Sequence, residues 1–557
     1  MTIRIVLVNN VLTMYLDAAY STQGGKTYRR YLLRESYRQE GKVKHRTIAN
    51  LSHCSEAEIA AIRLALRHKG DLALLGSVKE LNAQQGSRIG AVCCLQVVAQ
   101  RLGLAQALGT QRPGKLARWQ VFARLMDQGS RRSAVRLAES HAAGDLLGLD
   151  SFPEEHLYQN LAWLAQHQEA IEQRLFRRRY DDAAPQLFLY DVTSSYLEGV
   201  NNVLAAFGYN RDGKKGKQQL VIGLLTGPEG APVAVRVFAG NTQDPKTVTS
   251  QIRTLAENFG VSKVTLVGDR GMLKLPQLQA LTEHEFHYIT AITKPQIRQL
   301  LKTGAFQMHL FESELAEVVI DNIRYILRRN PQRVSELADN RQNKLSALQL
   351  RLSDKQRYLD EHPRAHPEIA RNKLADYAKL LKIDQWAKVT LSERNLGLSI
   401  DQAAWTHETQ LDGCYVIKSD VPGQIATAAA IHQRYKDLAQ VERAFRTFKS
   451  GHLEIRPTLV QTEASTRGHV FVVMLAYLLE RELAHYWRHL DLTVSEALDE
   501  LGSVRGIELA IANVKCQKVP QPTGLNQELV AAAQVKLPDT LPLRKTHVAT
   551  RKKLSDN

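Results

Sequence analysis

Two aspartates stand at the ends of apolar segments that are typical of buried strands. Asp191 follows the run 187–190 (LFLY), and Asp269 follows the run 264–267 (VTLV) after one glycine. A carboxylate at the end of a buried strand costs free energy unless a cation lies beside it. The two positions therefore predict a metal site shared by strands of one sheet. Asp244 competes for the second position, but it follows a Gly-Asn turn, and we expect it to cap that turn.

A third carboxylate, Glu442, lies on a downstream segment with helical periodicity. Tyr435, Glu442 and Lys449 are spaced by seven residues, which places them on one stripe of a helix. The apolar Leu438 and Phe445 share that stripe, so it should face the core, and a glutamate there needs a partner. A partly exposed helix with an ordinary surface glutamate is the alternative reading of the same pattern.

The donor types predict which metal such a site would hold. Two aspartates and one glutamate offer only oxygen ligands, which suit Mg²⁺ or Mn²⁺ better than zinc. The five cysteines show neither CxxC nor Cys/His spacing, which excludes a zinc site or a disulfide framework and favours a reducing cytoplasm. The scattered cysteines are Cys54, Cys93, Cys94, Cys414 and Cys516.

Length and charge narrow the class of protein further. The chain has 557 residues, which suggests two to four domains, and no apolar run long enough for a membrane span. It carries 74 Lys and Arg against 57 Asp and Glu, a formal net charge of +17, which favours a polyanionic partner. Basic residues recur on two segments, 27–38 and 43–51, that flank a predicted hairpin turn at 39–42. This hairpin either grips phosphates or is an ordinary solvated hairpin.

The elements that position the carboxylates form an α/β pattern. Residues 55–180 have helical periodicity with basic clusters, and from 184 the period changes to strand, hairpin, helix (about 246–259), strand, helix, strand. This order predicts an antiparallel meander joined to parallel strands by crossover helices. Residues 331–381 predict an antiparallel helical hairpin that breaks at His362-Pro363.

The carboxylate motifs resemble those of a known family. Tyr435, Glu442 and Lys449 resemble the Tyr-x2-Arg-x3-Glu-x6-Lys signature of bacterial insertion-sequence DDE transposases of the family-four type. LYDVTSSYLEG and VTLVGDRGM resemble their strand-end Asp motifs, and the similarity spans about 185–480. One departure is plain: Leu438 stands where the signature has Arg. The contribution of that arginine must come from elsewhere, and the candidates are Arg443 and Arg446.

The resemblance implies a fold, a chemistry and partners. The fold is a ribonuclease-H-like mixed sheet flanked by helices, interrupted by an insertion domain and preceded by a helical DNA-binding region. Asp191, Asp269 and Glu442 would be the catalytic metal ligands. The partners would be terminal inverted repeats and target DNA, bound by a homodimer in a synaptic complex in the bacterial cytoplasm.

DNA contacts are expected from residues beside the carboxylates. Lys449 is placed to pair with a phosphate as a point charge, and Arg446 lies three residues before it on the same segment. Tyr435 either bonds a phosphate or packs, and Arg270 either neutralises Asp269 or reaches DNA.

The expected activity is cleavage at the element's ends and joining of the 3′-hydroxyls to target DNA by two-metal phosphoryl transfer. Two alternatives remain: an inactive DNA-binding protein derived from such an element, and a metal-dependent nuclease without strand transfer. Trp386 and Trp405 either stack a flipped base or pack in a core, and His469 is expected to be structural.

Six regions are expected along the chain. They are a basic β-hairpin region at 1–54, a helical DNA-binding domain at 55–183, the first part of the catalytic core at 184–299, an insertion domain at 300–421, the second part of the core at 422–490, and a C-terminal region with a basic tail at 491–557.

Overall fold

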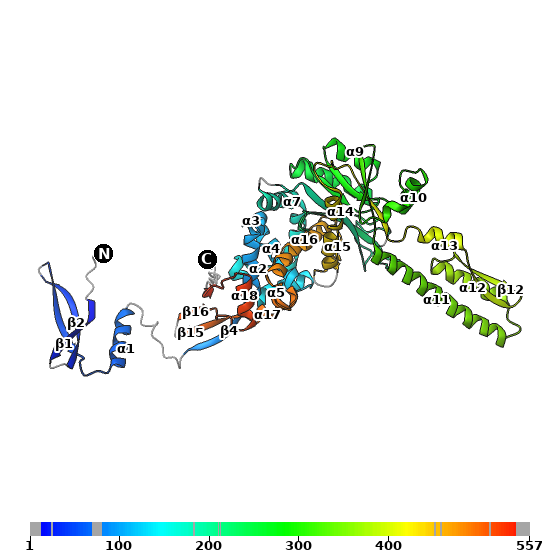
Figure 1. Cartoon of the computed structure of the whole chain (residues 1–557). Helices are drawn as coiled ribbons and strands as arrows, with labels where there is room; N and C mark the ends of the chain where they lie inside the picture. Colours follow the sequence, from blue (N-terminus) through cyan, green and yellow to red (C-terminus); the bar gives the residue numbers. More distant parts are fainter. Residues whose placement is uncertain are drawn as a thin grey trace, which may run out of the picture. The chain divides into compact units, whose positions relative to one another are not determined.

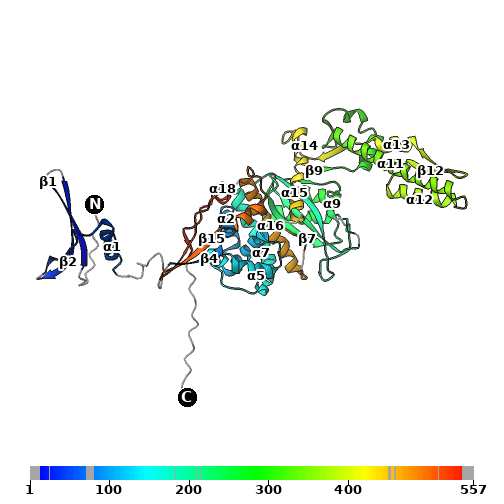
Figure 2. The ribbon, with the colours of Figure 1, turned by 90° about the horizontal axis from the view of Figure 1, so that it is seen from below.

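A computed structural model describes most of the chain, which divides into two units (Figures 1 and 2). The first unit comprises Met1–Gly90, Leu501–Glu528 and Lys536–Asn557, and the second comprises Ala91–Glu500 and Leu529–Val535. The described residues are 13–23, 26–39, 41–69, 81–181, 184–209, 211, 213–214, 216–449, 453–456, 459–511 and 514–541. The basic C-terminal tail and Glu40 of the predicted hairpin turn lie outside them.

The first unit holds two small antiparallel sheets. One has the order β1-β2-β3, and the helix α1 follows it, starting at a capping box between Ser55 and Glu58. The second has the order β17-β16-β15-β4. The expected hairpin is formed by β2 and β3, whereas β1 and β4 were not anticipated. Strand β4 is polar, and β1 lacks a clear alternation of polar and apolar residues. The bounds are β1 Thr13–Gln23, β2 Lys26–Gln39, β3 Lys42–Asn50, α1 Glu56–Arg67, β4 Asn82–Arg88, β15 Arg505–Ile511, β16 Val514–Lys518 and β17 Thr540–Leu541.

An eight-stranded mixed sheet forms the centre of the second unit, in the order β10-β11-β14-β9-β8-β5-β6-β7. Strands β5, β6 and β7 form the expected antiparallel meander, and β8 and β9 run parallel to β5. The apolar run of β6 is buried along its whole length. The bounds are β5 Leu187–Tyr196, β6 Gln219–Thr226, β7 Pro232–Ala239, β8 Thr265–Gly268, β9 His287–Ala291, β10 Ala316–Ile320, β11 Ile323–Arg329 and β14 Cys414–Ser419.

Helices connect these strands and cover the sheet. The crossover between β7 and β8 starts at Asp244 and ends in a π-helical turn, Thr254–Asn258. Side chains from these helices and from one face of the meander share one core, which includes Phe188, Leu225 and Leu255. The bounds are α8 Asp244–Arg253, α9 Leu275–Glu283 and α10 Lys294–Lys302.

Helices upstream of the sheet belong to the same unit as the sheet. Helix α7 packs against α16, and Gly468 allows this close approach because a Cβ there would collide with the Leu161 carbonyl. Phe176 of α7 stacks on Phe188 of β5. The boundary expected at 183/184 therefore lies inside one unit. The bounds are α2 Gly90–Arg101, α3 Leu104–Leu108, α4 Arg112–Met126, α5 Arg131–Ser140, α6 Ala143–Leu147, α7 Glu154–Tyr180 and α16 Glu463–Tyr486.

The expected helical hairpin is present between β11 and β14. Its helices are α11, Pro331–Glu361, and α12, Pro367–Leu380, and each has a proline in its first turn. A two-stranded sheet and the short helix α13, which was not anticipated, complete this part. However, β10, β11 and β14 extend the central sheet, so part of the expected insertion 300–421 is sheet. The further bounds are β12 Ala387–Ser392, β13 Asn395–Ile400 and α13 Gln402–Thr409.

Short helices complete the chain after the central sheet. Their bounds are α14 Ala428–Lys436, α15 Ala439–Lys449, α17 Val494–Leu501 and α18 Leu525–Ala532. Within the described residues, no helix is both long and apolar enough to cross a membrane.

Candidate active site

The parallel pairing of β5 and β8 brings two aspartates side by side. The last pair in the register is Tyr190 with Gly268, so Asp191 and Asp269 are the residues that come next along the chain after this pair. Adjacent strands are about 4.8 Å apart. Asp269 lies directly after β8 as expected. Asp191, in contrast, lies inside β5, because this strand continues to Tyr196 by pairing with β6 after β8 has ended.

The surroundings of Asp191 disfavour its negative charge. Burial raises the pKa of Asp191 to about 7, while the Val192 N–H, which donates to Asp191 Oδ1 at 2.7 Å, lowers it. Repulsion from Asp269 and Glu442 raises the pKa further, and the Arg211 guanidinium opposes this. The three carboxylates are therefore close enough to interact, and a cation among them would relieve the repulsion.

Glu442 reaches this place from a helix that is broken. The single helix expected through 431–449 is two helices, α14 and α15, because the N–H groups of Leu438, Gln440 and Val441 donate to carbonyls three residues back and tighten the turn. Leu438 is buried, but Glu442 is exposed to the cavity described next rather than packed in a core stripe. The apolar Leu438 and Phe445 are buried as expected, whereas Glu442 is exposed, as in the alternative reading of the pattern.

The predicted site residues line two adjoining cavities that share all three carboxylates. The larger has a volume of about 550 Å³ and the smaller about 360 Å³. The larger adds Arg270 and Tyr435, and the smaller adds Arg446 and Lys449. The residues predicted from the sequence that line one or both cavities are Asp191, Asp269, Glu442, Arg270, Tyr435, Arg446 and Lys449.

Tyr435 acts on one of the carboxylates. Its hydroxyl donates to Asp269 Oδ1 at 3.2 Å. Burial raises the pKa of Tyr435, and the charge of Asp269 adds to this shift. The hydroxyl therefore stays protonated at neutral pH and holds the Asp269 carboxylate in place, which neither of the two roles expected from the sequence included.

The donor set suits a hard divalent cation. All three side chains offer carboxylate oxygens, which Mg²⁺ prefers, and repulsion among them falls when a cation binds. Among the residues that the structure describes, no three His, Cys, Asp or Glu side chains are already grouped closely enough to hold a metal ion. The carboxylates would therefore have to close around an ion, and their role as ligands stays a prediction.

Two residues of the smaller cavity were missed or assigned differently. Arg211 forms an ion pair with Asp244, and its N–H donates to Ser194 Oγ at 3.0 Å. Asp244 is the first residue of α8 rather than a turn cap. The Asp-Pro pair at 244–245 is a local signal for the start of a helix, and it could have predicted that Asp244 begins α8. Arg211 lies in a loop, where the sequence carries no such signal.

Further cations line the larger cavity without a sequence signal. They come from separate elements, and only the tertiary structure brings them together. They are Lys294, Arg328, Arg333 and Lys436.

The aromatic and histidine candidates have structural surroundings. Trp386 is 2% exposed and packs edge-to-face on Trp405, with ring centroids 4.6 Å apart, in the core of the helical hairpin. This favours the packing reading for Trp386. His469 is buried, and its Nδ1 lies 3.1 Å from an Arg131 nitrogen, which fits the structural role expected for it.

Comparisons with known proteins place the chain among transposases. Residues 184–479, more than half of the chain, match the family model of the transposase DDE domain, and residues 19–74 match the N-terminal domain of IS1634 family transposases. No curated protein matches the chain. Among solved structures, the piggyBac transposase synaptic complex with hairpin DNA matches at 8% identity and a TM-score of 0.35, covering 75% of this chain and 82% of that one. That likeness is too distant to carry an argument.

Proposed function

Since this chain belongs to the transposase DDE family, we propose that it binds the terminal inverted repeats of its insertion sequence, cleaves DNA at the ends and joins the 3′-hydroxyls to target DNA. The observation that carries the proposal is that Asp191, Asp269 and Glu442, distant in sequence, line the same cavity. The order β7-β6-β5-β8-β9 supports a ribonuclease-H-like core. The finer family-four assignment rests on the spacing of Tyr435, Glu442 and Lys449.

The proposed chemistry assigns a task to each side chain. Asp191, Asp269 and Glu442 would hold Mg²⁺ or Mn²⁺, which activates an attacking oxygen and stabilises a leaving one. Tyr435 positions Asp269 through its hydrogen bond. Lys449 lies two turns after Glu442 on α15 and lines the same cavity, where it meets a DNA phosphate.

Further cations near the carboxylates take the role of DNA contacts in this proposal. Arg446 lies one turn after Glu442 on the same helix, and Arg270 follows Asp269 directly. Both side chains line the cavities that hold the carboxylates. We assign them to phosphates of the bound DNA, because a guanidinium can donate two parallel hydrogen bonds to one phosphate.

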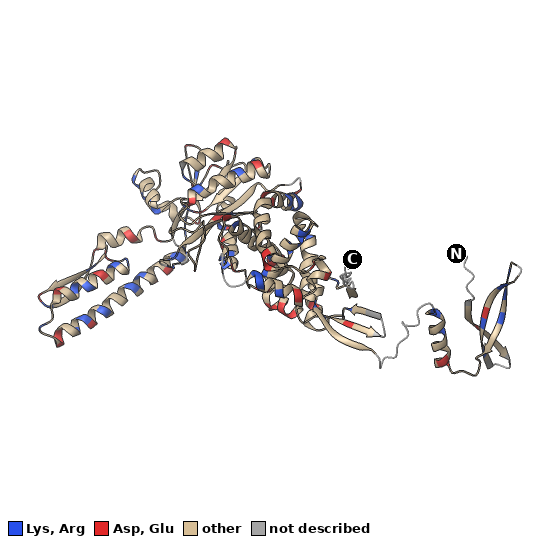
Figure 3. Cartoon of the chain, turned by 180° about the vertical axis from the view of Figure 1, so that it is seen from behind, with Lys and Arg blue, Asp and Glu red and all other residues tan. Residues whose placement is uncertain are grey.

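The charge distribution supports DNA binding by the N-terminal region. Residues 26–50, which form β2 and β3, carry eight Lys and Arg against two Glu. Helix α11 instead carries six basic and five acidic residues, and Figure 3 shows both signs interspersed along it. A surface of one sign binds phosphates better than a mixed one. We therefore assign end recognition to the N-terminal regions 1–54 and 55–183, within a homodimeric synaptic complex in the bacterial cytoplasm.

The test is joining of a labelled terminal-repeat DNA to a plasmid in the presence of Mg²⁺. The repeat is identified from the DNA that flanks the gene. Asp191→Asn, Asp269→Asn and Glu442→Gln should each abolish cleavage and joining while DNA binding persists. The control Asp376→Asn removes a carboxylate that is 75% exposed on α12 and should keep full activity.

The same assay separates the alternatives. A nuclease without strand transfer would cleave the labelled DNA and join nothing. An inactive DNA-binding protein would bind the repeat and neither cleave nor join it. Strong residual cleavage in one carboxylate variant would remove that residue from the site.

A further inference from the structure

A small, positively charged cavity lies at the start of α5. It has a volume of about 110 Å³ and shares no lining residue with the two carboxylate cavities. Its lining includes Arg124, Arg131 and His469, which are 5%, 8% and 2% exposed. Gln128 and Ser130 also line it and are exposed. The cavity therefore has a buried basic floor and a rim that reaches solvent.

The buried guanidinium of Arg131 forms no ion pair with a carboxylate in the described part of the chain. Its Nη2 lies 3.1 Å from His469 Nδ1, and its buried Nε has no hydrogen-bond partner among the described residues. His469 Nε2 lies 3.3 Å from the Ile455 carbonyl, so that nitrogen carries the proton and Nδ1 accepts from Arg131. Burial lowers the pKa of the His469 ring well below its usual value, so the histidine is neutral and Arg131 keeps the only charge of this pair.

The nearby carboxylates are engaged elsewhere. Glu454 itself lines the cavity, but it forms an ion pair with Arg456, which lines the cavity too. Asp127 accepts from the Gly129 N–H at 3.1 Å and from the Ser133 hydroxyl. Both carboxylates offset the charge of Arg124, whose Nη1 donates to the Gln128 carbonyl at 3.0 Å. Neither of them pairs with Arg131 in the described part of the chain.

The buried guanidinium is therefore costly as it stands. Burial lowers the pKa of Arg131 to about 9, and repulsion from Arg124 adds to this shift. A buried charge without a counter-ion is among the most expensive features of a protein interior. A bound anion would remove that cost.

The local backbone favours an anion at the same place. Helix α5 spans Arg131–Ser140 and begins at Ser130, so its positive end faces the cavity lined by Gly129, Ser130 and Arg131. The volume of about 110 Å³ is room for roughly four waters, enough for one tetrahedral oxyanion. A planar guanidinium can donate two parallel hydrogen bonds to such an anion.

We propose that this cavity is a binding site for a phosphate oxyanion, held by Arg124, Arg131 and the N-terminal end of α5. The anion has two possible sources, a backbone phosphate of DNA and free inorganic phosphate. The DNA source rests on the proposed function, whereas the anion site itself does not.

The first test measures thermal unfolding of the full chain in phosphate and in chloride at equal ionic strength and pH. Phosphate should raise the Tm of the wild type by about 2 °C. Arg131→Gln should lose this rise. The control Arg132→Gln removes the same charge from the next position of α5, where the side chain is exposed, and should keep the rise.

Two further measurements make this test decisive. In chloride alone, Arg131→Gln should be at least as stable as the wild type, because it removes a buried charge without a counter-ion. Arg131→Lys keeps the positive charge but loses the planar guanidinium that donates two parallel hydrogen bonds. This variant should therefore retain only part of the increase in Tm with phosphate. The proposal fails if phosphate does not raise the Tm of the wild type, or if Arg131→Gln folds and keeps the full rise.

A second arm identifies the source of the anion, using short duplex DNA. If a DNA phosphate occupies the cavity, inorganic phosphate should weaken DNA binding by the wild type more than chloride does, and Arg131→Gln should abolish this difference. If free phosphate occupies it, DNA affinity should be equal in the two buffers while the Tm rise remains. Neither readout requires DNA cleavage, so a failure of the proposed transposition chemistry would not affect it.

Discussion

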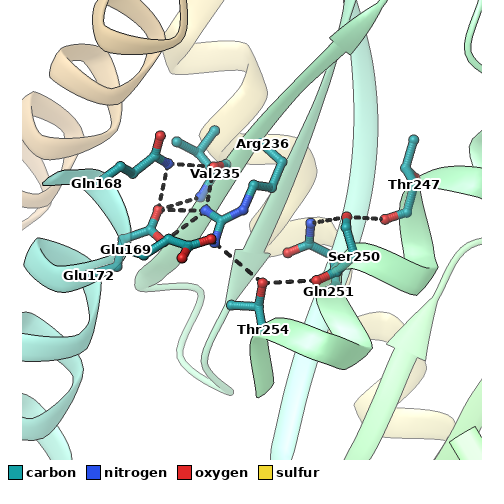
Figure 4. A network of polar contacts seen from close by, with 9 residues as sticks. All are labelled: Gln168, Glu169, Glu172, Val235, Arg236, Thr247, Ser250, Gln251 and Thr254. Carbon is teal, nitrogen blue, oxygen red and sulfur yellow. Dashed lines mark hydrogen bonds and ion pairs between the residues drawn. The ribbon is translucent and has the colours of Figure 1, made fainter. Parts of the chain in front are cut away.

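The ion pair between Glu172 and Arg236 offers a stability prediction whose size follows from the structure (Figure 4). Glu172 of α7 has a side chain only 1% exposed and accepts twice from Arg236 Nη1, at 2.9 and 2.7 Å. Its Oε1 also accepts from Gln168 Nε2 at 2.7 Å and from the Val235 N–H at 3.2 Å. This network joins α7 to the edge strand β7 of the central sheet.

Glu172→Gln keeps the volume of the side chain and removes its charge. Arg236, with a side chain 11% exposed, then keeps the Val235 carbonyl at 2.8 Å, Thr254 Oγ1 at 3.3 Å and the largely exposed Glu169 carboxylate at 3.9 Å. Breaking a buried pair in this way costs about 3–5 kcal/mol. Because volume is conserved, we expect the lower end, about 3 kcal/mol, with no added cost for a cavity.

The assay is urea unfolding of the full chain followed by far-UV circular dichroism. The control is Glu169→Gln, because Glu169 is 71% exposed and lies 3.9 Å from an Arg236 nitrogen. An exposed pair at this distance contributes less than about 1 kcal/mol. The double variant Glu172→Leu/Arg236→Met should regain most of the lost stability, since burial raises the pKa of Glu172 despite the guanidinium and shows that its desolvation is costly. Equal midpoints for Glu172→Gln and Glu169→Gln would refute this reasoning.

Three other predictions concern DNA cleavage and binding. Lys449→Ala should weaken end binding or cleavage by about 1–3 kcal/mol with little change in unfolding midpoint, and Lys449→Arg should restore activity only in part; wild-type strand-transfer rates at limiting DNA would contradict this. Tyr435→Phe removes the hydrogen bond to Asp269 and should raise the Mg²⁺ concentration needed for half-maximal cleavage by about tenfold, at unchanged DNA affinity. Arg38→Gln on β2 should lower terminal-repeat affinity and flatten its salt dependence, whereas Arg357→Gln on α11, matched in charge, should leave both unchanged, and the reverse outcome would place recognition in the helical hairpin.

Local signals in the sequence were sufficient for several elements. The start and end of α11 and the end of α12 were predicted to within one residue. Prolines start both helices of this hairpin, and His362-Pro363 ends the first. The strands β5 to β9 followed from apolar runs bounded by turn residues. The three carboxylates could be singled out because each is an acidic residue in or beside an apolar pattern.

What the sequence could not determine depends on contacts between distant segments. Asp191 lies inside β5 because β6 continues to pair there after β8 has ended, and the break at Leu438 depends on backbone hydrogen bonds that a regular helical pattern hides. Strand β14 lies between β11 and β9 in the central sheet, but nothing in its own residues specifies these two neighbours. Arg211 reaches the carboxylates from a loop without periodicity.

The sequence by itself determined the residue types and local periods, and hence most of the elements and the acidic residues that line the candidate site. Only the tertiary structure decided that α2–α7 share a unit with the sheet, that Tyr435 binds Asp269, and that Arg131 is buried beside His469. Periodicity is a property of neighbouring residues, which one segment carries alone. The partner of a strand, the counter-charge of a buried arginine and the donor to a carboxylate come from elsewhere in the chain, so folding has to bring them together.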